Sequence, residues 1–280
     1  MIGVYLMGGL GNQMFQYAAG MVLAEKYNTS LLLDLDWFNQ EFDRHTTPRH
    51  YELNSFDLSS KSRIMPGGIV GRAVRRIATF SEYNEQFFEY NHNFNRLKNG
   101  TLLKGYFQSE KYFCDIRDEL LSDFSWAKEA KGKNKELLEN ISRDASSVSV
   151  HVRRGDYVSN ESAAKFHGLT GVDYYNAAFK RIKEQIKKPN LYVFSDEPDW
   201  CRKNLKFDAP TVYVSHNSDG SEDMRLMKAC RHNIIANSSF SWWGAWLNEN
   251  PDKIVIAPKQ WFSHSESNTK DVVPESWQKI

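Results

Sequence analysis

The sequence predicts an α/β protein built from two doubly wound domains that face a central cleft. Three observations support this fold. A strand, a glycine turn, a helix and a second strand follow one another at the start of the chain, and strands alternate with helices more regularly after residue 145. The length of 280 residues is also enough for two modest hydrophobic cores. Parallel sheets of this kind bind ligands beyond the carboxyl ends of their strands.

The N-terminal domain is expected to span residues 1–145. A short apolar run opens it, and apolar residues at helical spacing follow the glycine turn. Between residues 37 and 100 the periodicity is poor and Pro, Gly, Asn and Arg are frequent, which indicates an irregular insertion with long connections. The elements expected in this domain are strands 2–6, 31–35 and 101–107 and helices 12–27, 109–124 and 133–143.

The C-terminal domain, residues 146–280, is expected to be the more regular one. Its pattern is typical of a doubly wound sheet, and a cleft between two such domains suits an enzyme with two substrates. The expected strands are 147–153, 190–195, 211–214, 233–236 and 253–257, and the expected helices are 173–187, 198–205, 221–231 and 239–248.

Composition and charge exclude several classes of protein. The 36 Lys and Arg residues nearly balance the 35 Asp and Glu residues, so no net charge draws the chain to nucleic acid or to an anionic membrane. The chain has no signal-peptide pattern and no apolar run of about eighteen residues, which predicts a cytoplasmic protein without a transmembrane segment. The three cysteines are widely spaced, which argues against a disulfide framework and a zinc site.

One local basic cluster, formed by Arg72, Arg75 and Arg76, stands apart from this balance. It is typical of a solvated helix face, and weak peripheral association with a membrane or binding of an acceptor is the alternative. The oligomeric state is left open by the sequence.

The segment HVRRGDY places His151, Arg153, Arg154 and Asp156 where the strand 147–153 ends. Ligands bind at this position in open α/β sheets. A guanidinium group matches phosphate oxygens with fork-shaped donors and keeps its charge, so these arginines indicate a site for a diphosphate. The alternative is a structural pair in which Arg154 and Asp156 hold a turn.

The glycine turn GGLGNQ brings the backbone amides of Gly11 and Asn12 to a helix N-terminus. Free amides and the helix dipole favour an anion there, such as a β-phosphate. A tight turn without any ligand explains the same pattern equally well. After the next strand, Asp34 and Asp36 match the DxD pattern by which metal-dependent glycosyltransferases hold a metal ion, but acids are common at strand ends and we expect no metal here.

A second hydroxyl-rich turn puts Ser238, Ser239 and Ser241 at the start of the helix 239–248. Their hydroxyls and amides could bind phosphate, and ordinary N-capping is the alternative. The helical spacing of the tryptophans that follow favours core packing over a sugar platform. These residues are Trp242, Trp243 and Trp246.

Carboxylates mark two further helix starts. Asp223 falls in the first turn of the helix 221–231, for which Ser221 is the expected N-cap, and its carboxylate could accept from the N1–H and exocyclic amine of guanine. Asp196 and Glu197 end a strand before a helix that starts with proline. Helix capping is the expected role of this pair, and a ribose or acceptor contact is the alternative.

Five segments in this order resemble the motif set of the bacterial α-1,2-fucosyltransferases of glycosyltransferase family 11. The resemblance spans residues 3 to about 262 and implies a GT-B-like pair of Rossmann-type domains, in which the N-terminal domain is on the acceptor side and the C-terminal domain binds GDP-fucose. It also implies inverting transfer of fucose from GDP-β-L-fucose to the 2-hydroxyl of a galactosyl residue in a glycan, with no metal and no cofactor. The segments are GGLGNQMFQYAAG, GYFQSEKYF, HVRRGDY, FSDEPDW and ANSSFSWWGAWL.

A weaker similarity to the α-1,6- and protein O-fucosyltransferases implies roles for single residues. His151 and Asp223 would contact guanine, and Arg153 or Arg154 would bind the β-phosphate. Phosphate would also meet Ser239 and the amides of Gly11 and Asn12. The α-1,6 relatives carry an acid ten residues after the histidine, and Glu161 stands at that offset.

The residue that takes the proton from the acceptor stays open among Asp156, Glu161 and His167. The acceptor itself is not specified, because its loops are expected in the stretch 37–100 and in residues 158–172. Two other functions fit less well: a transferase for another GDP-sugar such as GDP-mannose, and a non-catalytic glycan- or RNA-binding protein. Near-zero net charge and the lack of an RNA-binding motif weigh against RNA.

Overall fold

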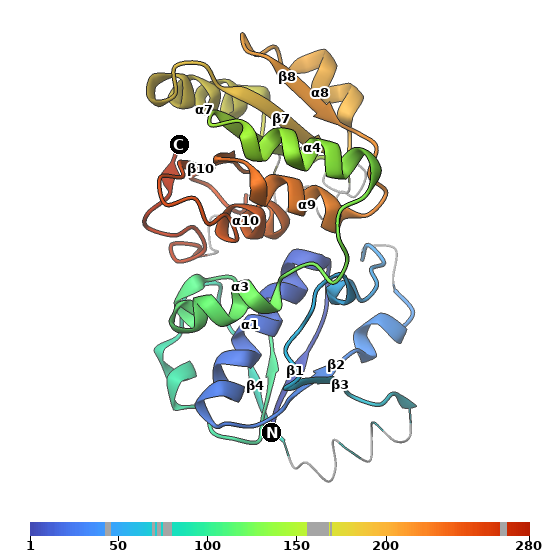
Figure 1. Cartoon of the computed structure of the whole chain (residues 1–280). Coiled ribbons are helices and arrows are strands. Elements are labelled where there is room, and N and C mark those ends of the chain that lie inside the picture. Colours follow the sequence, from blue (N-terminus) through green and yellow to red (C-terminus); the bar gives the residue numbers. More distant parts are fainter. Residues whose placement is uncertain are drawn as a thin grey trace. The chain divides into compact units, whose positions relative to one another are not determined.

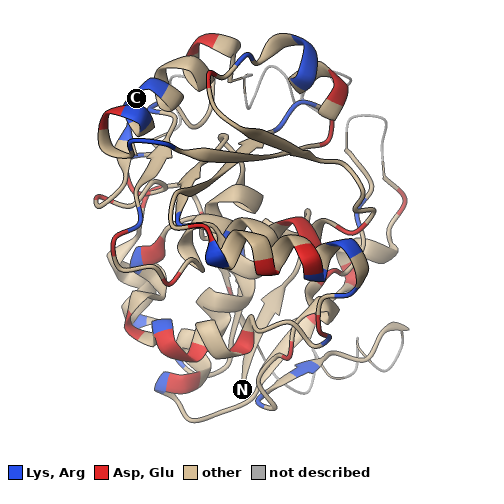
Figure 2. Cartoon of the chain, turned by 45° about the horizontal axis from the view of Figure 1, so that its top comes forward, with Lys and Arg blue, Asp and Glu red and all other residues tan. Residues whose placement is uncertain are grey.

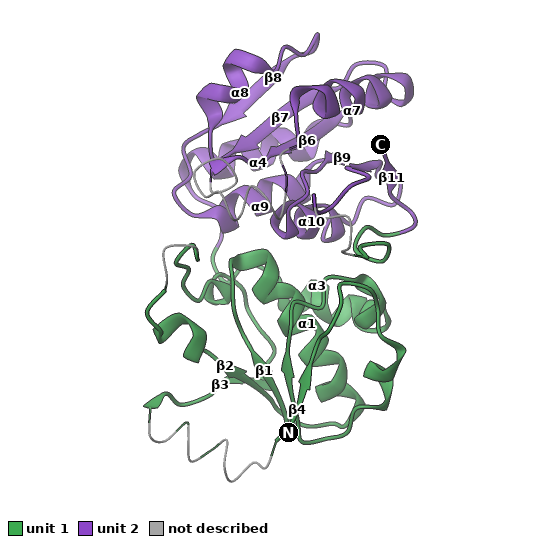
Figure 3. Cartoon of the chain, turned by 180° about the vertical axis from the view of Figure 1, so that it is seen from behind, with its two compact units in different colours: residues 1–128, 267–274 green, residues 129–266, 275–280 purple. Residues whose placement is uncertain are grey.

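The computed structural model describes residues 1–42, 46–68, 80–155, 170–263 and 268–280, together with residues 71, 74 and 168. The chain forms two compact units (Figure 3). Unit 1 comprises residues 1–128 and 267–274, and unit 2 comprises residues 129–266 and 275–280. Each unit contains one parallel sheet with helices packed on it (Figure 1), so the α/β prediction is confirmed for both halves.

The sheet of unit 1 has five strands in the order β3-β2-β1-β5-β4. Residues Ile2, Val4 and Leu33 are almost fully buried at its centre, as expected for a strand covered on both faces. The main elements are β1 (Ile2–Tyr5), α1 (Leu10–Lys26), β2 (Leu31–Asp34), β3 (Ser62–Ile64), β4 (Ser81–Asn84), β5 (Thr101–Lys104) and α3 (Arg117–Asp123). Short 3₁₀ helices connect them at Asp36–Asn39, Leu53–Ser55, His92–Arg96, Glu110–Tyr112 and Cys114–Ile116.

Three predictions for this half are corrected by the structure. The stretch 37–100 contains strands β3 and β4, which escape a sequence pattern because they are three and four residues long and mostly exposed. The helix expected at 109–124 is broken into two 3₁₀ turns followed by α3. The strand expected at 101–107 ends at Lys104, because the chain leaves extended geometry and Phe107 adopts a positive φ of 52°.

The sheet of unit 2 has six strands in the order β11-β10-β9-β6-β7-β8. The expected alternation is confirmed, and one strand near the C-terminus was not anticipated because it has only two residues. The elements are α4 (Gly132–Arg143), β6 (Ser147–Val152), α7 (Val172–Gln185), β7 (Asn190–Ser195), α8 (Pro198–Asn204), β8 (Thr211–Val214), α9 (Gly220–Ala229), β9 (His232–Ile234), α10 (Ser239–Trp246), β10 (Val255–Ala257) and β11 (Gln278–Lys279).

Two apolar clusters lie on the two faces of this second sheet. Alternate side chains of a strand point to opposite faces, so Val193 of β7 joins the cluster with α7 and α8, whereas Phe194 joins the cluster with α4 and α9. Val150 and Val152 of β6 belong to the α7 and α8 side. Helices therefore cover both faces of the sheet, as Figure 1 shows.

The boundary between the units differs from the division at residue 145 that the sequence predicts. Helix α4 packs against α9 and contributes Ile141 to the apolar cluster of unit 2, so the division falls after Lys128. Sequence periodicity shows that α4 is amphipathic, but it does not show which sheet the apolar face covers.

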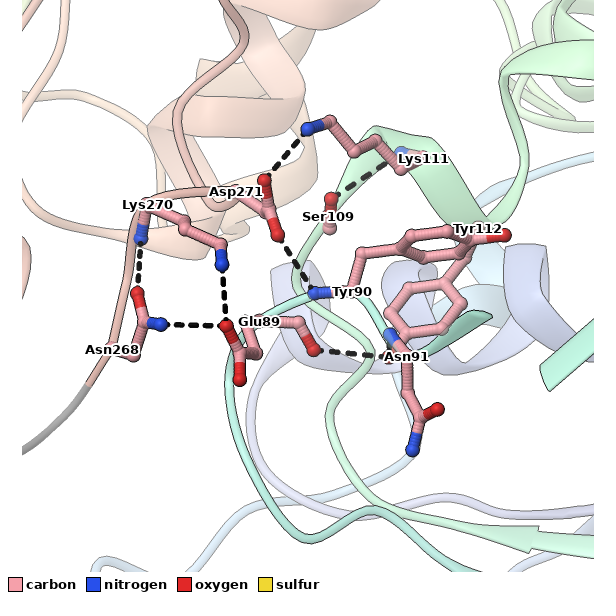
Figure 4. A network of polar contacts seen from close by, with 9 residues as sticks. All are labelled: Glu89, Tyr90, Asn91, Ser109, Lys111, Tyr112, Asn268, Lys270 and Asp271. Carbon is pink, nitrogen blue, oxygen red and sulfur yellow. Dashed lines mark hydrogen bonds and ion pairs between the residues drawn. The ribbon is translucent and has the colours of Figure 1, made fainter. Parts of the chain in front are cut away.

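The segment 267–274 is a second departure, because it returns to unit 1 after most of unit 2 is complete. Figure 4 shows how its described part is held. Asp271 accepts from Lys111 Nζ at 2.7 Å and from the Tyr90 amide at 3.0 Å, and Lys270 pairs with Glu89 at 2.7 Å. Only 8 % of the Asp271 side chain is exposed, so this carboxylate is the buried anchor of the segment.

The outer helices carry Lys, Arg, Asp and Glu intermixed (Figure 2), in keeping with the balanced composition. The described part of the chain has no helix that is both long and apolar enough to cross a membrane.

Candidate functional site

The carboxyl ends of three neighbouring strands in unit 2 bring the predicted residues together. Strand β6 lies between β9 and β7, and all three run parallel. His151 is the last residue but one of β6, Asp196 follows β7, and Ser238 lies between β9 and α10. Because parallel strands end at the same edge of a sheet, residues that are far apart in sequence meet there.

His151 is a buried, uncharged ring at this edge. Its side chain points toward α10, where its centroid lies 5.3 Å from that of Phe240. Burial lowers the pKa of His151, and the nearby Arg153 lowers it further against the opposing effect of Asp196. Its Nδ1 atom is buried and has no hydrogen-bond partner among the described residues. A neutral imidazole with a free nitrogen is suited to a polar ligand that reaches this position.

Arg153 forms the central ion pair of the edge. Its Nη1 atom lies 2.9 Å from Asp196 Oδ2, and both side chains are about one-quarter exposed, at 24 % and 25 %. Asp196 Oδ1 accepts from the Arg154 amide at 3.0 Å. At Gly155 a Cβ atom would lie 2.8 Å from Asp196 Oδ2, so only glycine allows this close approach of backbone and carboxylate. Asp196 therefore holds the turn that follows β6.

Arg154 points to the other side of the sheet. Its guanidinium lies 3.8 Å from the centroid of the Trp200 ring on α8, and its Nε atom donates to Glu197 Oε2 at 3.1 Å. The side chain is 16 % exposed. Arg154 is therefore held in a structural pair with Glu197, and the alternative pair with Asp156 lies outside the described residues. Trp200 was not singled out by the sequence, because nothing local links it to Arg154.

Asp223 lies in the first turn of α9, as expected. The N-cap of α9 is Asp219, whose side chain accepts from the Ser221 amide, so the expected capping role of Ser221 is corrected. Asp223 Oδ1 accepts from Asn217 Nδ2 at 2.7 Å. Burial raises the pKa of Asp223 to about 6, with smaller contributions from Asp219 and Glu222.

The three serines before and in α10 differ in what they can reach. Ser238 is the N-cap residue, yet its side chain makes no capping hydrogen bond. Ser239 is the first residue of the helix and is partly exposed. Ser241 is fully buried, and its hydroxyl donates back to the Ala236 and Ser238 carbonyls. The Ser241 hydroxyl is therefore engaged by the backbone, and a phosphate contact from it stays a prediction.

The tryptophans of α10 are core residues, as expected. Trp242 and Trp243 have no exposed surface, and Trp246 is 3 % exposed. Their rings pack on one another, with centroids 5.1 Å apart for Trp242 and Trp243 and 5.0 Å apart for Trp243 and Trp246.

Gly11 and Asn12 lie in unit 1, near the start of α1. The Asn12 amide already donates to the Gly9 carbonyl at 2.9 Å, and the Asn12 side chain accepts from Gln108 Nε2 at 2.8 Å. The structure thus corrects the expectation that the Asn12 amide is free to bind phosphate. The pattern of Asp34 and Asp36 forms a local turn, because Asp34 Oδ1 accepts from the Asp36 amide at 3.1 Å.

Several predicted residues lie outside the described ranges. These are Asp156, Glu161 and His167, the three candidates for the base, and the basic cluster of Arg72, Arg75 and Arg76. Within the described ranges no group of three or more His, Cys, Asp or Glu residues is arranged to hold a metal ion.

Two α/β units, each built on one parallel sheet, are the architecture of the GT-B fold. The chain belongs to glycosyl transferase family 11, whose sequence model matches residues 1–280. It is 37 % identical to "Alpha-1,2-colitosyltransferase" of Escherichia coli, over 98 % of this chain and 97 % of that protein. It is 36 % identical to "O-antigen biosynthesis glycosyltransferase WbnK" of Escherichia coli, over 97 % of this chain and 98 % of that protein.

Solved structures with the same fold have little sequence in common with this chain. Fucosyltransferase NodZ from Bradyrhizobium aligns with a TM-score of 0.52 and 13 % identity, over 87 % of this chain and 91 % of that one. A variant of Arabidopsis thaliana FUT1 in complex with GDP aligns with a TM-score of 0.52 and 10 % identity, over 99 % of this chain and 75 % of that one. The chain is therefore a glycosyltransferase with the GT-B fold that the sequence predicts.

Proposed function

We propose that this glycosyltransferase transfers L-fucose from GDP-β-L-fucose to the 2-hydroxyl of a galactosyl residue in a glycan, with inversion at the anomeric carbon. The observation that supports this most is the charged carboxyl edge of unit 2, where His151, Arg153 and Asp196 meet. The α-1,2 linkage in the name of the colitosyltransferase relative and the GDP in the FUT1 structure agree with the proposed linkage and donor.

The two arginines, Arg153 and Arg154, have different roles in this proposal. Arg153 follows the last residue of β6 and lies close enough to His151 for its charge to lower the pKa of that ring. Arg154 is stacked on Trp200 and paired with Glu197 on the α8 side. Arg153 is thus our choice for the donor diphosphate, and Arg154 supports the turn.

Guanine recognition is assigned to Asp223 with His151. A carboxylate accepts two parallel hydrogen bonds from the N1–H and the exocyclic amine of guanine, which adenine and the pyrimidines do not offer together. Helix α9 packs against β6, the strand that carries His151. Ser238 and Ser239 at the start of α10 would complete the phosphate contacts.

The reaction is a single displacement. The acceptor O2 attacks the anomeric carbon, the bond from that carbon to the β-phosphate oxygen breaks, and its electron pair leaves with GDP. Arg153 stabilises the charge that develops on the departing diphosphate. The acceptor proton passes to a base, for which Asp156, Glu161 and His167 remain our candidates.

A second donor is favoured by one observation, the 37 % identity to an α-1,2-colitosyltransferase. Colitose is fucose without the 3-hydroxyl, so the two donors differ by one polar group. A site that hydrogen-bonds this hydroxyl rejects the deoxy sugar strongly, whereas an apolar site accepts both.

The test is incubation of the purified protein with GDP-fucose, GDP-colitose or GDP-mannose and a panel of β-galactosides, with and without EDTA. We expect a 2-O-fucosylated product, unchanged turnover in EDTA, and thermal stabilisation by GDP but not by UDP, CMP or ADP. Transfer from GDP-colitose alone would replace the fucose assignment. Absence of transfer from every donor would contradict the proposal. The proposal keeps the expected cytoplasmic location, which cell fractionation can check.

A further inference from the structure

A cavity of about 400 Å³ opens at the carboxyl edge of the sheet in unit 1. It lies where three neighbouring parallel strands end, with Tyr5 from β1, Lys104 from β5 and Asn84 from β4 in its lining. Open α/β sheets bind ligands at this edge, and small-molecule sites occupy roughly 300–1,000 Å³. All three strands and all lining residues belong to unit 1, so the cavity is complete within this unit.

Aromatic rings form the walls of this cavity. The rings of Phe88 and Tyr106 lie nearly parallel, at an interplanar angle of 11° with centroids 6.5 Å apart. Phe87, also in the lining, is 64 % exposed, the most exposed of the large apolar side chains in the described ranges. Flat aromatic faces beside polar side chains suit the C–H face of a pyranose ring and the hydroxyls around it.

The charges of the cavity disfavour a phosphate ligand. Lys104 is the cation among the lining residues, and its Nζ atom lies 2.7 Å from Glu82 Oε1 and 5.9 Å from the centroid of the Tyr5 ring. Glu85 adds an acidic group to the same lining. A neutral, hydroxylated ligand fits this balance better than a nucleotide diphosphate does.

Glu85 fixes the aromatic wall in place. Its Oε2 atom accepts from the Tyr106 amide at 2.6 Å and from the Phe107 amide at 2.9 Å. A Cβ atom at Gly105 would lie 2.3 Å from the Glu85 Cβ, so the chain can pass this carboxyl group only at a glycine. Phe107 is held at a positive φ of 52°, a conformation that costs free energy for a residue with a side chain.

The carboxyl group of Glu85 is a second energetically unfavourable feature of this wall. The other carboxyl oxygen, Glu85 Oε1, is buried and has no hydrogen-bond partner among the described residues. Buried unsatisfied oxygens and strained backbone are uncommon, and they concentrate at sites with a function. The cavity wall therefore combines an exposed aromatic residue, Phe87, with two energetically unfavourable features, the unsatisfied Glu85 oxygen and the positive φ of Phe107.

We propose that this cavity binds a pyranose ring of the acceptor glycan, with Phe87 against the apolar face of the ring and Asn84 and Lys104 within reach of its hydroxyls. The identification of the ligand as the acceptor depends on the proposed transferase function. Glu85 is a positioning residue, because it acts on the ligand through Tyr106.

The test compares Phe87→Ala with Ile64→Ala. Both residues are large, apolar and exposed, at 64 % and 54 %, but Ile64 lies on β3, the outermost strand on the other side of the sheet from β4. With the galactoside that gives most turnover, we expect Phe87→Ala to raise the KM for the acceptor about tenfold. The KM for the GDP-sugar and the thermal stabilisation by GDP should stay at the wild-type values. Ile64→Ala should change none of these quantities.

A direct binding measurement separates this inference from the proposed function. Saturation-transfer NMR is recorded on lactose and N-acetyllactosamine with the whole protein and GDP, which requires no turnover. We expect transfer to the ring protons in the wild type and in Ile64→Ala, and its loss in Phe87→Ala. Three results would overturn the proposal: an unchanged acceptor KM in Phe87→Ala, equal saturation transfer to the sugar in both variants, or no saturation transfer in the wild type. A protein that binds these sugars through Phe87 but transfers nothing would contradict the transferase function instead.

Discussion

The carboxyl edges of the two sheets differ in the side chains that they carry. In unit 2 the edge is charged, with ion pairs from Arg153 to Asp196 and from Arg154 to Glu197. In unit 1 the edge is lined by aromatic rings and by Lys104, which is neutralised by Glu82. Both edges are formed by the carboxyl ends of parallel strands, so the side chains at the strand ends decide the chemistry. A charged edge suits a nucleotide diphosphate, and an aromatic edge suits a sugar ring.

Replacement of the two arginines by alanine is the strongest test of the charged edge. Arg153→Ala is expected to lower kcat by about 10²–10³, because the departing diphosphate loses a positioned donor. Arg154→Ala should mainly lower the thermal midpoint, because it removes the stacking on Trp200 and the pair with Glu197. Its effect on kcat should be smaller than that of Arg153→Ala. Steady-state turnover and thermal denaturation measure the two effects. Arg202→Ala on the exposed side of α8 is the control. Normal turnover and tight GDP binding in both Arg153→Ala and Arg154→Ala would contradict the diphosphate site.

The next largest effect concerns Asp223 and GDP affinity. Asp223→Asn is expected to weaken GDP binding about tenfold, because one of two hydrogen bonds to guanine and the negative charge are lost. Burial raises the pKa of Asp223 to about 6, and only the ionised form accepts both bonds. Wild-type affinity should therefore fall as the pH decreases through about 6, and the variant should lose this dependence. Calorimetric titration between pH 5 and pH 8 measures both. Asp208→Asn, whose side chain is 97 % exposed, should behave as the wild type.

The aromatic edge predicts an effect of Glu85 on stability. Burial raises the pKa of Glu85 to about 7, against two backbone hydrogen bonds that lower it. Between the unfolded value near 4.5 and this folded value the folded state binds more protons, so the free energy of unfolding decreases as the pH rises across that window. Glu85→Gln should remove this slope, which amounts to at most about 3 kcal/mol. Urea denaturation at pH 4.5 and pH 7.5 measures it, and equal slopes in both proteins would show that folding does not raise the pKa of Glu85.

The smallest expected effect concerns the segment that returns to unit 1. Burial raises the pKa of Asp271, but the hydrogen bonds from Lys111 and from the Tyr90 amide outweigh this effect and hold the pKa below its usual range. The stabilisation is therefore present above the unfolded pKa and is lost as the pH falls through the folded value. Asp271→Asn should cost about 1–2 kcal/mol in the free energy of unfolding and leave GDP affinity unchanged. Urea denaturation and calorimetry measure the two quantities, and a large loss of GDP affinity would show that the segment acts beyond unit 1.

Sequence reasoning was most successful where patterns are local. The elements of unit 2 from β6 to β10 and the tryptophan core of α10 follow from periodicity, because these elements are buried along a regular face. It was least successful in the stretch 37–100. Strands β3 and β4 lie at the two sides of the sheet of unit 1 and bury little surface, so their residues carry no alternating pattern. The cavity residues Glu85 and Phe87 fall in the same stretch.

The sequence by itself determined the α/β class, the position of HVRR at a strand end and the family of the protein. Only the tertiary structure decided that Arg154 stacks on Trp200 of α8, and that Asp196 and Glu197 are the partners of the two arginines. It also decided that residues 267–274 pack on unit 1 and that Glu85 supports the wall of a cavity. The physical reason is the same in each case. Periodicity records whether a side chain is buried, but the identity of its partner depends on the order of parallel strands, which brings together residues far apart in the chain.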